Sequence, residues 1–470
     1  MKYGVVFGIL LTTISIACSD VTDFGKLYPS KVHKIIYPTT TAQVQQIVSQ
    51  ACAQNKKVSV AGARHSQGGQ SNASDSVNID MLHMNKLLEL DTVHKIVRVQ
   101  AGMSWEQLQD ILQQYGLSVK VMQASNVFSI GGSVAVNAHG RDPHYGSLIE
   151  TVQALKIVDC QGTIKELNRQ KNPELFSLVV GGYGLLGIIV EVELSVTDNC
   201  VCEKKQQEMS YKAYVDYLFK NVLPQKNIQL HYARLVNIPG KDYLKRVLCI
   251  DYIKKKGVVP TTPLPKEGHV FWNQMLLRTY RKFWSRTFNN VRWYIEERMT
   301  APWENVKVLT RNHVMRPYVH SLEGQSKHTT DLLQEYFIPA ESFEFFVEQL
   351  KRFSEKYRIK LLNVTLRWTP RNTESFLSYS KQDTIAFVLY FTTPTHERAL
   401  SKVQEYTRAL TDACLQSSGS FYLPYQRFAT ESQMQKAYPN MKRFIKLKNK
   451  YDSCDVFTNN WYRDYILPMY

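Results

Sequence analysis

A glycine-rich turn near residue 65 carries a single histidine. It follows the strand-like run 57–60 and contains Gly62, Ala63, Arg64, His65, Ser66, Gln67 and Gly68. Glycines let the backbone adopt positive φ and approach a ligand, and successive free N–H groups in such a turn bind anions. An imidazole held there can act as a base, a metal ligand or a covalent attachment point. A plain surface turn with an exposed histidine explains the same segment equally well.

Two further glycine-dense stretches follow the first turn. The second contains Gly131, Gly132, Asn137, His139, Gly140 and His144, and the third ends at Gly187 and Ile188. Small residues at turns and helix starts suit a pyrophosphate or a tightly packed planar ring. Tight packing corners are the alternative for each stretch alone, and three stretches together weaken that alternative. No Gly-x-Gly-x-x-Gly follows the first strand, which argues against a dinucleotide-binding Rossmann unit.

Apolar periodicity predicts the elements that position these turns. Helices are expected within 38–56, 84–90, 105–115 and 343–357. Strands are expected at 58–60, 77–81, 94–102, 188–194, 336–338, 361–368 and 384–392. From about residue 198 glycine becomes rarer while aromatic and basic residues become more frequent, which indicates a change of domain.

The composition is that of a folded globular protein. At 470 residues the expectation is two to three domains, and an apolar content of 44% excludes a disordered chain. The net charge of +17 favours anionic neighbours such as a phosphorylated cofactor or acidic lipid headgroups. The net charge is the only feature of the sequence that suggests a nucleic-acid partner, so we expect none.

The first 20 residues are typical of a targeting segment. Lys2 precedes an apolar run that ends in small residues before Cys18, and this run is too short to span a bilayer comfortably. A cleaved secretory signal, a lipoprotein-like cysteine and an uncleaved anchor all fit. The segment therefore predicts an exported or membrane-associated protein, located in the periplasm, the cell envelope or the secretory route.

The cysteines and one aromatic segment carry weaker signals. Eight cysteines form no CxxC pair and no metal-like cluster, so we expect no metal site, mostly buried thiols and an occasional disulfide. Residues 270–300 interleave aromatic side chains with arginines. This pattern fits an interfacial helix in peripheral contact with a membrane, and it also fits a helix packed on its own domain.

The three glycine stretches, in this order and spacing, resemble the PCMH-type FAD-binding domain of the vanillyl-alcohol-oxidase superfamily. The resemblance covers 30–197 and 421–465. It implies an α+β fold, in which a two-subdomain FAD-binding domain at 30–197 is joined to an antiparallel-sheet-and-helix substrate (cap) domain at 198–420. A C-terminal segment, 421–470, would then return to the flavin site.

The same resemblance implies that the three stretches bind FAD. The first would wrap the pyrophosphate, the second would contact pyrophosphate and flavin, and Gly187 and Ile188 would close over the adenine. His65 stands where many members bond the flavin covalently, although Ala63 and Arg64 replace the more usual pair of glycines. Since 126–150 contains no cysteine, at most one covalent link is expected.

The closing segment 438–459 resembles the tail shared by sugar and aldonolactone oxidases and decaprenylphosphoryl-ribose oxidases. In lactone oxidases a Glu-x-Arg pair on a cap strand faces the flavin. Here Arg367 is present and Thr365 replaces the glutamate, which predicts an arginine without its carboxylate partner. Tyr425 stands where the ribose enzymes carry a lysine near the flavin.

The resemblance therefore implies an FAD-dependent oxidase or dehydrogenase acting on a sugar, sugar-lactone or similar alcohol. Hydride leaves a CH–OH carbon for flavin N5, and the hydroxyl proton needs an acceptor. Arg367 is the first candidate for stabilising the reduced flavin and Arg427 the second, while Tyr425, His144 and His139 are candidates for proton handling. An NADPH-dependent C=C reductase and a membrane-associated flavin-binding protein without turnover are the alternatives. The electron acceptor is not predicted.

Overall fold

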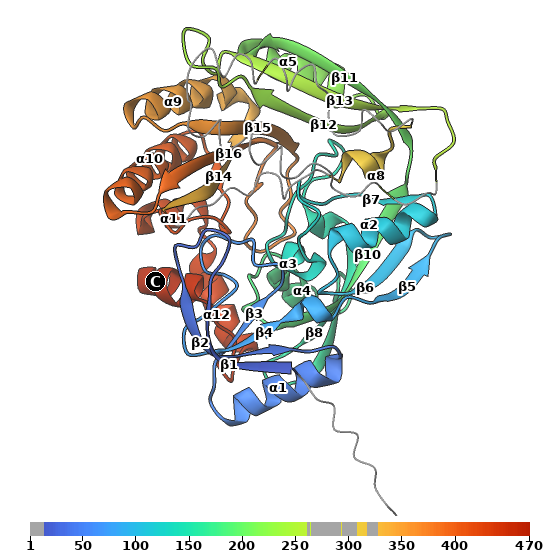
Figure 1. Cartoon of the computed structure of the whole chain (residues 1–470), viewed down its shortest axis with the longest axis vertical. Coiled ribbons are helices and arrows are strands. Elements are labelled where there is room, and N and C mark those ends of the chain that lie inside the picture. The colour runs from blue at the N-terminus through green and yellow to red at the C-terminus, as the bar shows by residue number, and fades with distance from the viewer. Residues whose placement is uncertain (1–13, 261–263, 265–292, 294–307, 317–327) are drawn as a thin grey trace, which may run out of the picture.

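A computed structural model describes residues 14–260, 264, 293, 308–316 and 328–470 (Figure 1). Its described part contains three β-sheets. The first sheet has the order β1-β2-β4-β3, with β1 (Ile14–Val21), β2 (Ser30–Tyr37), β4 (Val77–Asp80) and β3 (Val58–Ala61). The second has the order β5-β6-β10-β8-β9 with β7 also on β10, and consists of β5 (Leu87–Asp91), β6 (Ile96–Gln100), β10 (Ile188–Asp198), β8 (Val152–Val158), β9 (Ile164–Asn168) and β7 (Leu117–Val119).

Helices with well-defined starts accompany these two sheets. They are α1 (Thr41–Ala53), α2 (Trp105–Gln114), α3 (Ile130–Ala135) and α4 (Pro173–Val179). Capping boxes begin α1 and α2, because the side chains of Thr40 and Ser104 accept from the third backbone N–H of each helix. The predicted helices within 38–56 and 105–115 are thus confirmed.

One predicted helix, 84–90, is wrong. The chain there forms β5, an edge strand that pairs antiparallel with β6, with Leu87 opposite Val99. A short 3-10 turn over Met81–His83 precedes it. Leu87 and Leu88 are exposed, so the apolar spacing did not mark a buried helical face, and pairing with β6 satisfies the backbone instead.

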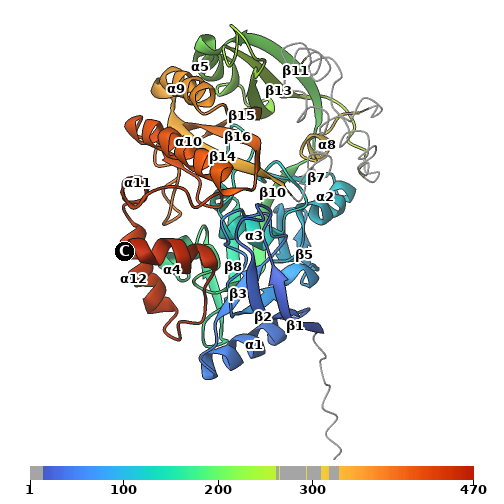
Figure 2. The ribbon, with the colours of Figure 1, turned by 60° about the vertical axis from the view of Figure 1, so that its left-hand side comes forward.

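The third sheet forms the cap and is antiparallel throughout. Its order is β11-β13-β12-β15-β16-β14-β17, with β11 (Val201–Ser210), β13 (Arg246–Lys255), β12 (Ile228–Leu235), β15 (Leu361–Thr369), β16 (Thr384–Pro394), β14 (Thr329–Pro339) and β17 (Ser420–Phe421). Helices α5 (Tyr214–Tyr217), α9 (Phe343–Lys356) and α10 (Glu397–Gln416) lie on one face (Figure 2). Tyr336 on β14 packs on Phe346 and donates to Thr407 O, so even-numbered β14 residues meet these helices.

Alternation along β14 and β15 therefore turns Glu335 and Arg367 to the other face, toward the loop of the FAD-binding domain that carries His139. The short helix α8 (Arg311–Val314) lies between the cap and the second sheet (Figure 1). Short 3-10 and π turns complete the described elements at Leu148–Glu150, Tyr211–Ala213, Leu218–Val222, Ala340–Ser342, Tyr462–Ile466 and Leu467–Met469. The fold confirms the predicted two-subdomain FAD-binding domain with an antiparallel cap.

The C-terminal segment returns to the first sheet. After α11 (Glu431–Ala437) and α12 (Met441–Tyr451), Val58 N donates to Val456 O at 2.7 Å and Thr458 N donates to Val58 O at 2.9 Å. A disulfide between Cys52 on α1 and Cys454 fixes this return. The described free thiols, Cys160, Cys200, Cys202, Cys249 and Cys414, are buried.

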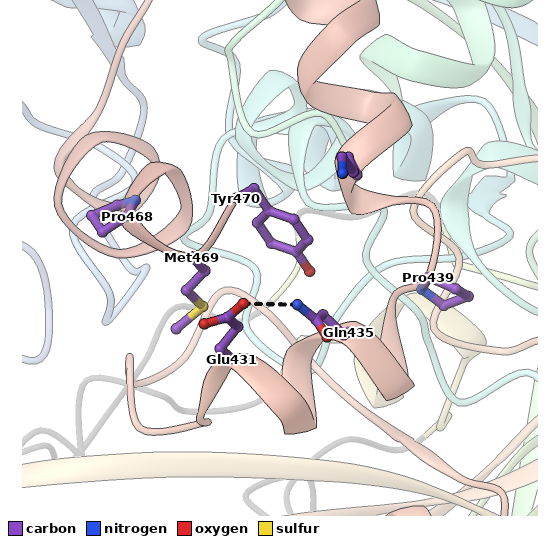
Figure 3. Close-up of a pocket in the computed structure, with 7 residues that line it drawn as sticks. Glu431, Gln435, Pro439, Pro468, Met469 and Tyr470 are labelled. Carbon is purple, nitrogen blue, oxygen red and sulfur yellow. Dashed lines mark hydrogen bonds between the residues drawn. The ribbon is translucent and has the colours of Figure 1, made fainter.

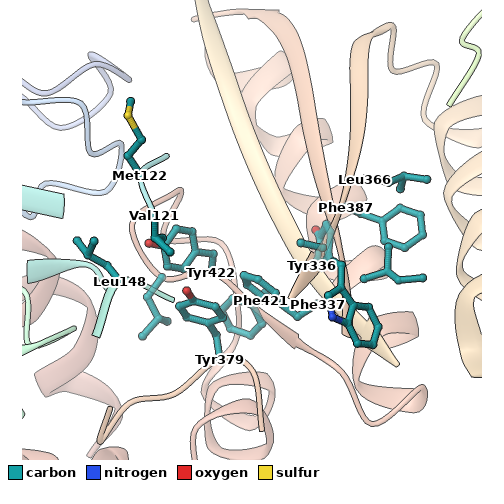
Figure 4. Packing of buried hydrophobic residues seen from close by; sticks show 14 of the residues in the cluster. Val121, Met122, Leu148, Tyr336, Phe337, Leu366, Tyr379, Phe387, Phe421 and Tyr422 are labelled. Carbon is teal, nitrogen blue, oxygen red and sulfur yellow. The ribbon is translucent and has the colours of Figure 1, made fainter. Parts of the chain in front are cut away.

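One apolar core runs through both domains. Figure 4 shows Tyr379, Tyr422 and Phe337 between side chains of the FAD-binding domain, such as Val121, and those of the cap sheet, such as Phe387. Phe337 stacks on Tyr379 with ring centroids 4.3 Å apart. The cap is therefore held in a fixed position over the glycine stretches.

Two predicted segments lie largely outside the described residues. Residues 1–13 of the targeting segment are not described, and its remainder is part of β1. Of the aromatic and basic segment 270–300 only Trp293 is described, and it is buried. No helix in the described part of the chain is long and apolar enough to cross a membrane.

Candidate functional site

The first and second glycine stretches meet at Ser129. A Cβ added to Gly62 would lie 1.9 Å from Ser129 Oγ, and one added to Gly132 would lie 2.9 Å from the same atom. On the other side, a Cβ on Gly68 would lie 2.5 Å from the carbonyl oxygen of Tyr425. The first turn therefore lies between the second stretch and the C-terminal segment, and these glycines leave room that a side chain would fill.

Arg64 explains why this turn tolerates a residue other than glycine. Its backbone has φ of 55°, in the left-handed region where glycine is favoured. Its Nη2 donates to Asn78 Oδ1 at 2.7 Å and to Asp80 Oδ2 at 2.9 Å. These bonds to β4 offset the backbone strain and hold the turn open.

Buried polar atoms around this turn fit an absent ligand. Ser66 Oγ, both amide atoms of Gln123 and Ser125 Oγ are buried and have no hydrogen-bond partner among the described residues. Such groups are rare unless a partner is supplied. A pyrophosphate and an isoalloxazine ring offer many acceptors and some donors, so the residues present fit FAD.

His65 lies between two phenylalanines. Its ring is half-buried, with centroids 5.6 Å from Phe24 and 4.3 Å from Phe128. Phe128 belongs to the loop that carries Gln123 and Ser125. The packing fixes the imidazole beside the groups that fit FAD, as the covalent-attachment hypothesis requires.

The second stretch is shaped by its own packing. Gly131 N donates to Ala101 O at 2.7 Å, and a Cβ on Gly131 would lie 2.7 Å from Ala101 Cβ. Asn137 has φ of 48°, donates to Ser147 Oγ and accepts from Ile149 N. These contacts explain the glycine and the asparagine structurally, and they position His139.

His139 pairs with a carboxylate that the sequence analysis missed. Its Nε2 lies 2.5 Å from Glu335 Oε1, and both side chains are buried. Tyr425 Oη donates to Glu335 Oε2 at 3.3 Å. Three segments far apart in the chain thus meet at one carboxyl group.

The electrostatics keep Glu335 charged and Tyr425 protonated. Burial raises the pKa of Glu335, but His139 and Arg367 outweigh it and lower that pKa below its usual 4.5. Burial and the charge of Glu335 raise the pKa of Tyr425 well above 10. The pair therefore consists of a carboxylate and a phenol that donates to it.

Arg367 lies on the same face of the cap sheet as Glu335. Its charge lowers the pKa of Glu335 on β14, and no hydrogen bond joins the two side chains in the described part of the chain. Thr365 Oγ1 accepts from Asn363 Nδ2 at 2.8 Å. Arg367 therefore lacks a carboxylate at position 365, while strand pairing places Glu335 close enough to interact with it electrostatically.

The other predicted residues lie around this centre. Gln67 Oε1 accepts from Leu333 N at 3.0 Å and ties the first turn to β14. Gly187, at φ of 142°, comes directly before Ile188, which is fully buried and pairs with Val158. Arg427 donates to Gly68 O and lies over Tyr28, so it braces the back of the turn.

His144 is set apart from the cluster. It is exposed, and its Nε2 lies 3.1 Å from Ile228 O at the start of β12. No contact recorded within the described ranges joins it to Glu335 or Arg367. A pocket on the C-terminal helices, lined by Glu431, Gln435 and Tyr470, shares no residue with the site either (Figure 3).

Glu335 could have been found from the sequence by one signal. It interrupts the apolar run 332–338, where a buried charge needs a partner. Its partners, His139 and Tyr425, lie 196 and 90 residues away. Only the assembled sheet shows that they meet.

Comparisons with known proteins agree with this geometry. Residues 32–168 match the FAD binding domain family, and residues 252–465 match the D-arabinono-1,4-lactone oxidase family. Residues 32–168 are thus similar to an FAD-binding domain of the PCMH type. Residues 252–465 are similar to a D-arabinono-1,4-lactone oxidase domain, and the relatives include aldonolactone oxidases and dehydrogenases.

Three relatives illustrate the similarity. L-galactono-1,4-lactone dehydrogenase of Brassica oleracea is 32% identical over 244 residues, 52% of this chain and 40% of that protein. L-gulonolactone oxidase of Mus musculus is 28% identical over 200 residues, 43% and 44% of the two chains. D-arabinono-1,4-lactone oxidase of Candida glabrata is 25% identical over 262 residues, 55% and 47%. The chain thus spans less than half of each relative, and the predicted resemblance and FAD cofactor are confirmed.

Proposed function

We propose that the protein is an FAD-dependent oxidoreductase that removes a hydride from a CH–OH carbon of a sugar, sugar lactone or similar alcohol. The meeting of Glu335, His139 and Tyr425 between the FAD-binding loops and the cap sheet carries this proposal. The names of the relatives, which are lactone oxidases and dehydrogenases, support the substrate class.

Each residue of this cluster has a separate role in the proposed reaction. FAD, when bound, accepts the hydride. The Tyr425 hydroxyl donates a hydrogen bond to Glu335. The lone pairs of its oxygen can therefore accept the proton of the substrate hydroxyl. As that proton arrives, the tyrosyl proton passes to Glu335 Oε2, and His139 on Oε1 holds the carboxylate in place. Arg367 supplies positive charge where negative charge develops.

A test needs the purified protein, a panel of sugar lactones and alcohols, and an artificial electron acceptor. We expect a flavin spectrum that bleaches anaerobically with substrate, and acceptor reduction under turnover. Bleaching by NADPH alone would favour the C=C reductase alternative. A flavin that no alcohol reduces would favour the binding protein without turnover.

For location, we propose an exported or membrane-associated protein. The disulfide between Cys52 and Cys454 supports an oxidising compartment, where such bonds persist. Peripheral membrane contact through 270–300 rests on the aromatic and basic pattern alone. Co-sedimentation with anionic vesicles, compared with a variant whose arginines in this segment are replaced by glutamine, tests it.

A further inference from the structure

We propose that Arg141 and Arg367 together bind a carboxylate of the substrate, so that the substrate is a polyhydroxy acid rather than a neutral lactone. This inference rests on the proposed function, since it names the substrate class of the same site. It depends on the positions of the two guanidinium groups and on the lack of a carboxylate that hydrogen-bonds to them among the described residues.

The two arginines approach one another from different domains. Arg141 follows His139 and Gly140 in the second glycine stretch, and its guanidinium lies 5.1 Å from the ring centroid of Tyr232 on β12. Its carbonyl oxygen accepts from His231 N at 2.8 Å, which fixes the loop on that strand.

Strand register then brings Arg367 to the same place. Ala233 pairs with Leu366, so Tyr232 and Arg367 occupy neighbouring positions on β12 and β15 and face the same way. Arg141, over the ring of Tyr232, therefore lies close enough to Arg367 for the two charges to interact. Burial lowers the pKa of Arg367, Glu335 opposes this, and the like charge of Arg141 lowers it further.

Glu335 does not satisfy these cations by hydrogen bonds. Its Oε1 is occupied by His139 and its Oε2 by Tyr425. Arg367 is only 8% exposed, and its Nε is buried without a partner among the described residues. Leaving a buried donor unpaired is costly, and the like charge of Arg141 adds to that cost.

A carboxylate of the substrate would accept from the unpaired donor of Arg367 and would offset the two positive charges. Guanidinium groups donate two parallel N–H bonds to a carboxylate or a phosphate, and such pairs are among the stronger hydrogen bonds in proteins. A lactone ring has no charge to offer, whereas the ring-opened aldonate does. The polar and uncharged Thr365, next to Arg367 on the same face, leaves the positive charge in place.

The experiment compares aldonates with their lactones on the FAD-loaded enzyme. We use pentonates and hexonates at a pH where the two forms interconvert slowly. We expect kcat/KM to favour an aldonate over its lactone by about 10-fold or more. Arg141→Gln should lower kcat/KM for the aldonate by about 10- to 100-fold, the effect of one charge-assisted pair, and should lower the lactone value clearly less. Arg141→Lys should recover part of the loss.

A binding measurement runs beside the kinetics. Oxalate, which has no CH–OH group to oxidise, should perturb the flavin spectrum saturably in the wild type and in the matched surface control Arg398→Gln, and not in Arg141→Gln. Inorganic phosphate is titrated in parallel. Tighter binding of phosphate than of oxalate would overturn the carboxylate assignment in favour of a sugar phosphate.

The outcomes separate this inference from the proposed function. Lactone oxidation that exceeds aldonate oxidation, or an equal loss of both in Arg141→Gln, overturns the inference and leaves the proposed function standing. If no alcohol reduces the flavin, the proposed function fails. Oxalate binding that depends on Arg141 would still support the anion site in that case.

Discussion

Glu335 carries a charge in the middle of an apolar strand, and each of its oxygens has a different partner. His139 holds Oε1 and Tyr425 donates to Oε2. The sheet itself forms through backbone pairing, in which Glu335 lies opposite Val388 on β16. A buried charge retained at this cost is typical of functional sites.

Removing either end of this relay should slow the chemical step. Glu335→Gln and Tyr425→Phe are expected to lower kcat by about 100- to 10,000-fold, the range of general acid–base catalysis, with FAD still bound. Because the pKa of Glu335 lies below 4.5, its ionised form is lost only as pH falls past that value, so the acid limb of kcat in the wild type should lie below pH 4.5.

Pre-steady-state flavin reduction across pH measures both effects. Loss of the acid limb in Glu335→Gln would mark a functional carboxylate. A variant that keeps the wild-type rate of flavin reduction would show that Glu335 only supports the fold.

His65 decides how FAD is held. If the packed imidazole bonds the flavin, the denatured wild-type protein should keep its flavin fluorescence and the mass of FAD, and His65→Ala should lose both. His33→Ala, at another histidine, serves as the control. Fluorescence lost from both wild type and variant would mean that FAD is bound without a covalent link.

At the scale of elements, the loop before β2 responds to pH through Asp23. Its Oδ2 accepts from Gly69 N at 2.7 Å, and burial raises the pKa of Asp23 from 3.8 to about 6. A raised folded pKa means stability that is present below pH 3.8 and is lost as pH rises through 6. The expected loss is about 3 kcal/mol in the free energy of unfolding.

Asp23→Asn should remove this dependence, because the amide cannot ionise. Relative to wild type, the variant should gain stability as pH rises from about 4 to about 7, measured by urea unfolding at each pH. The exposed Glu405→Gln is the control. Parallel pH profiles for wild type and Asp23→Asn would contradict the assignment.

The disulfide joins α1 to the segment after α12 that hydrogen-bonds to Val58 on β3 of the first sheet. Cys52→Ser should lower the free energy of unfolding by about 2 to 5 kcal/mol. A reducing agent should lower the melting temperature of the wild type toward that of the variant and leave the variant unchanged. Equal responses of the two proteins to reductant would show that the bond does not form in solution.

Elements with a clear period or cap could be predicted from the sequence, and those that depend on a neighbour could not. Thr40 and Ser104 predict the starts of α1 and α2, because their capping hydrogen bonds are to residues close in sequence. β5 is defined by β6, which lies later in the chain. In the site, the glycine turns could be predicted from the sequence. The role of Glu335 could not, because it depends on the contacts with His139 and Tyr425 in the folded protein.

At the scale of the whole molecule, Arg311 ties the cap to the FAD-binding domain. It is fully buried, pairs with Asp142 at 2.9 Å, and donates to Lys120 O at 2.8 Å and to Gln229 O at 2.9 Å. Arg311→Met leaves Asp142 charged without this partner and should cost about 3 to 5 kcal/mol.

Calorimetry should then show two transitions in place of one, as the cap loosens before the FAD-binding domain unfolds. The double variant Arg311→Met/Asp142→Asn should recover part of the loss, because the uncompensated charge is gone. A single unshifted transition in Arg311→Met would show that the shared apolar core alone couples the domains.

The return of the C-terminal segment has a consequence for biosynthesis. Cys52 and Cys454 are 402 residues apart in sequence, and Val456 and Thr458 hydrogen-bond to Val58, four residues before Gly62. A nascent chain that does not yet include Val456 and Thr458 would therefore lack one wall of the first turn. Contacts of such long range also slow folding. FAD would then bind only after the C-terminal segment has folded back. Chains that lack this segment would remain apoprotein and would be exposed to cellular proteases in that form.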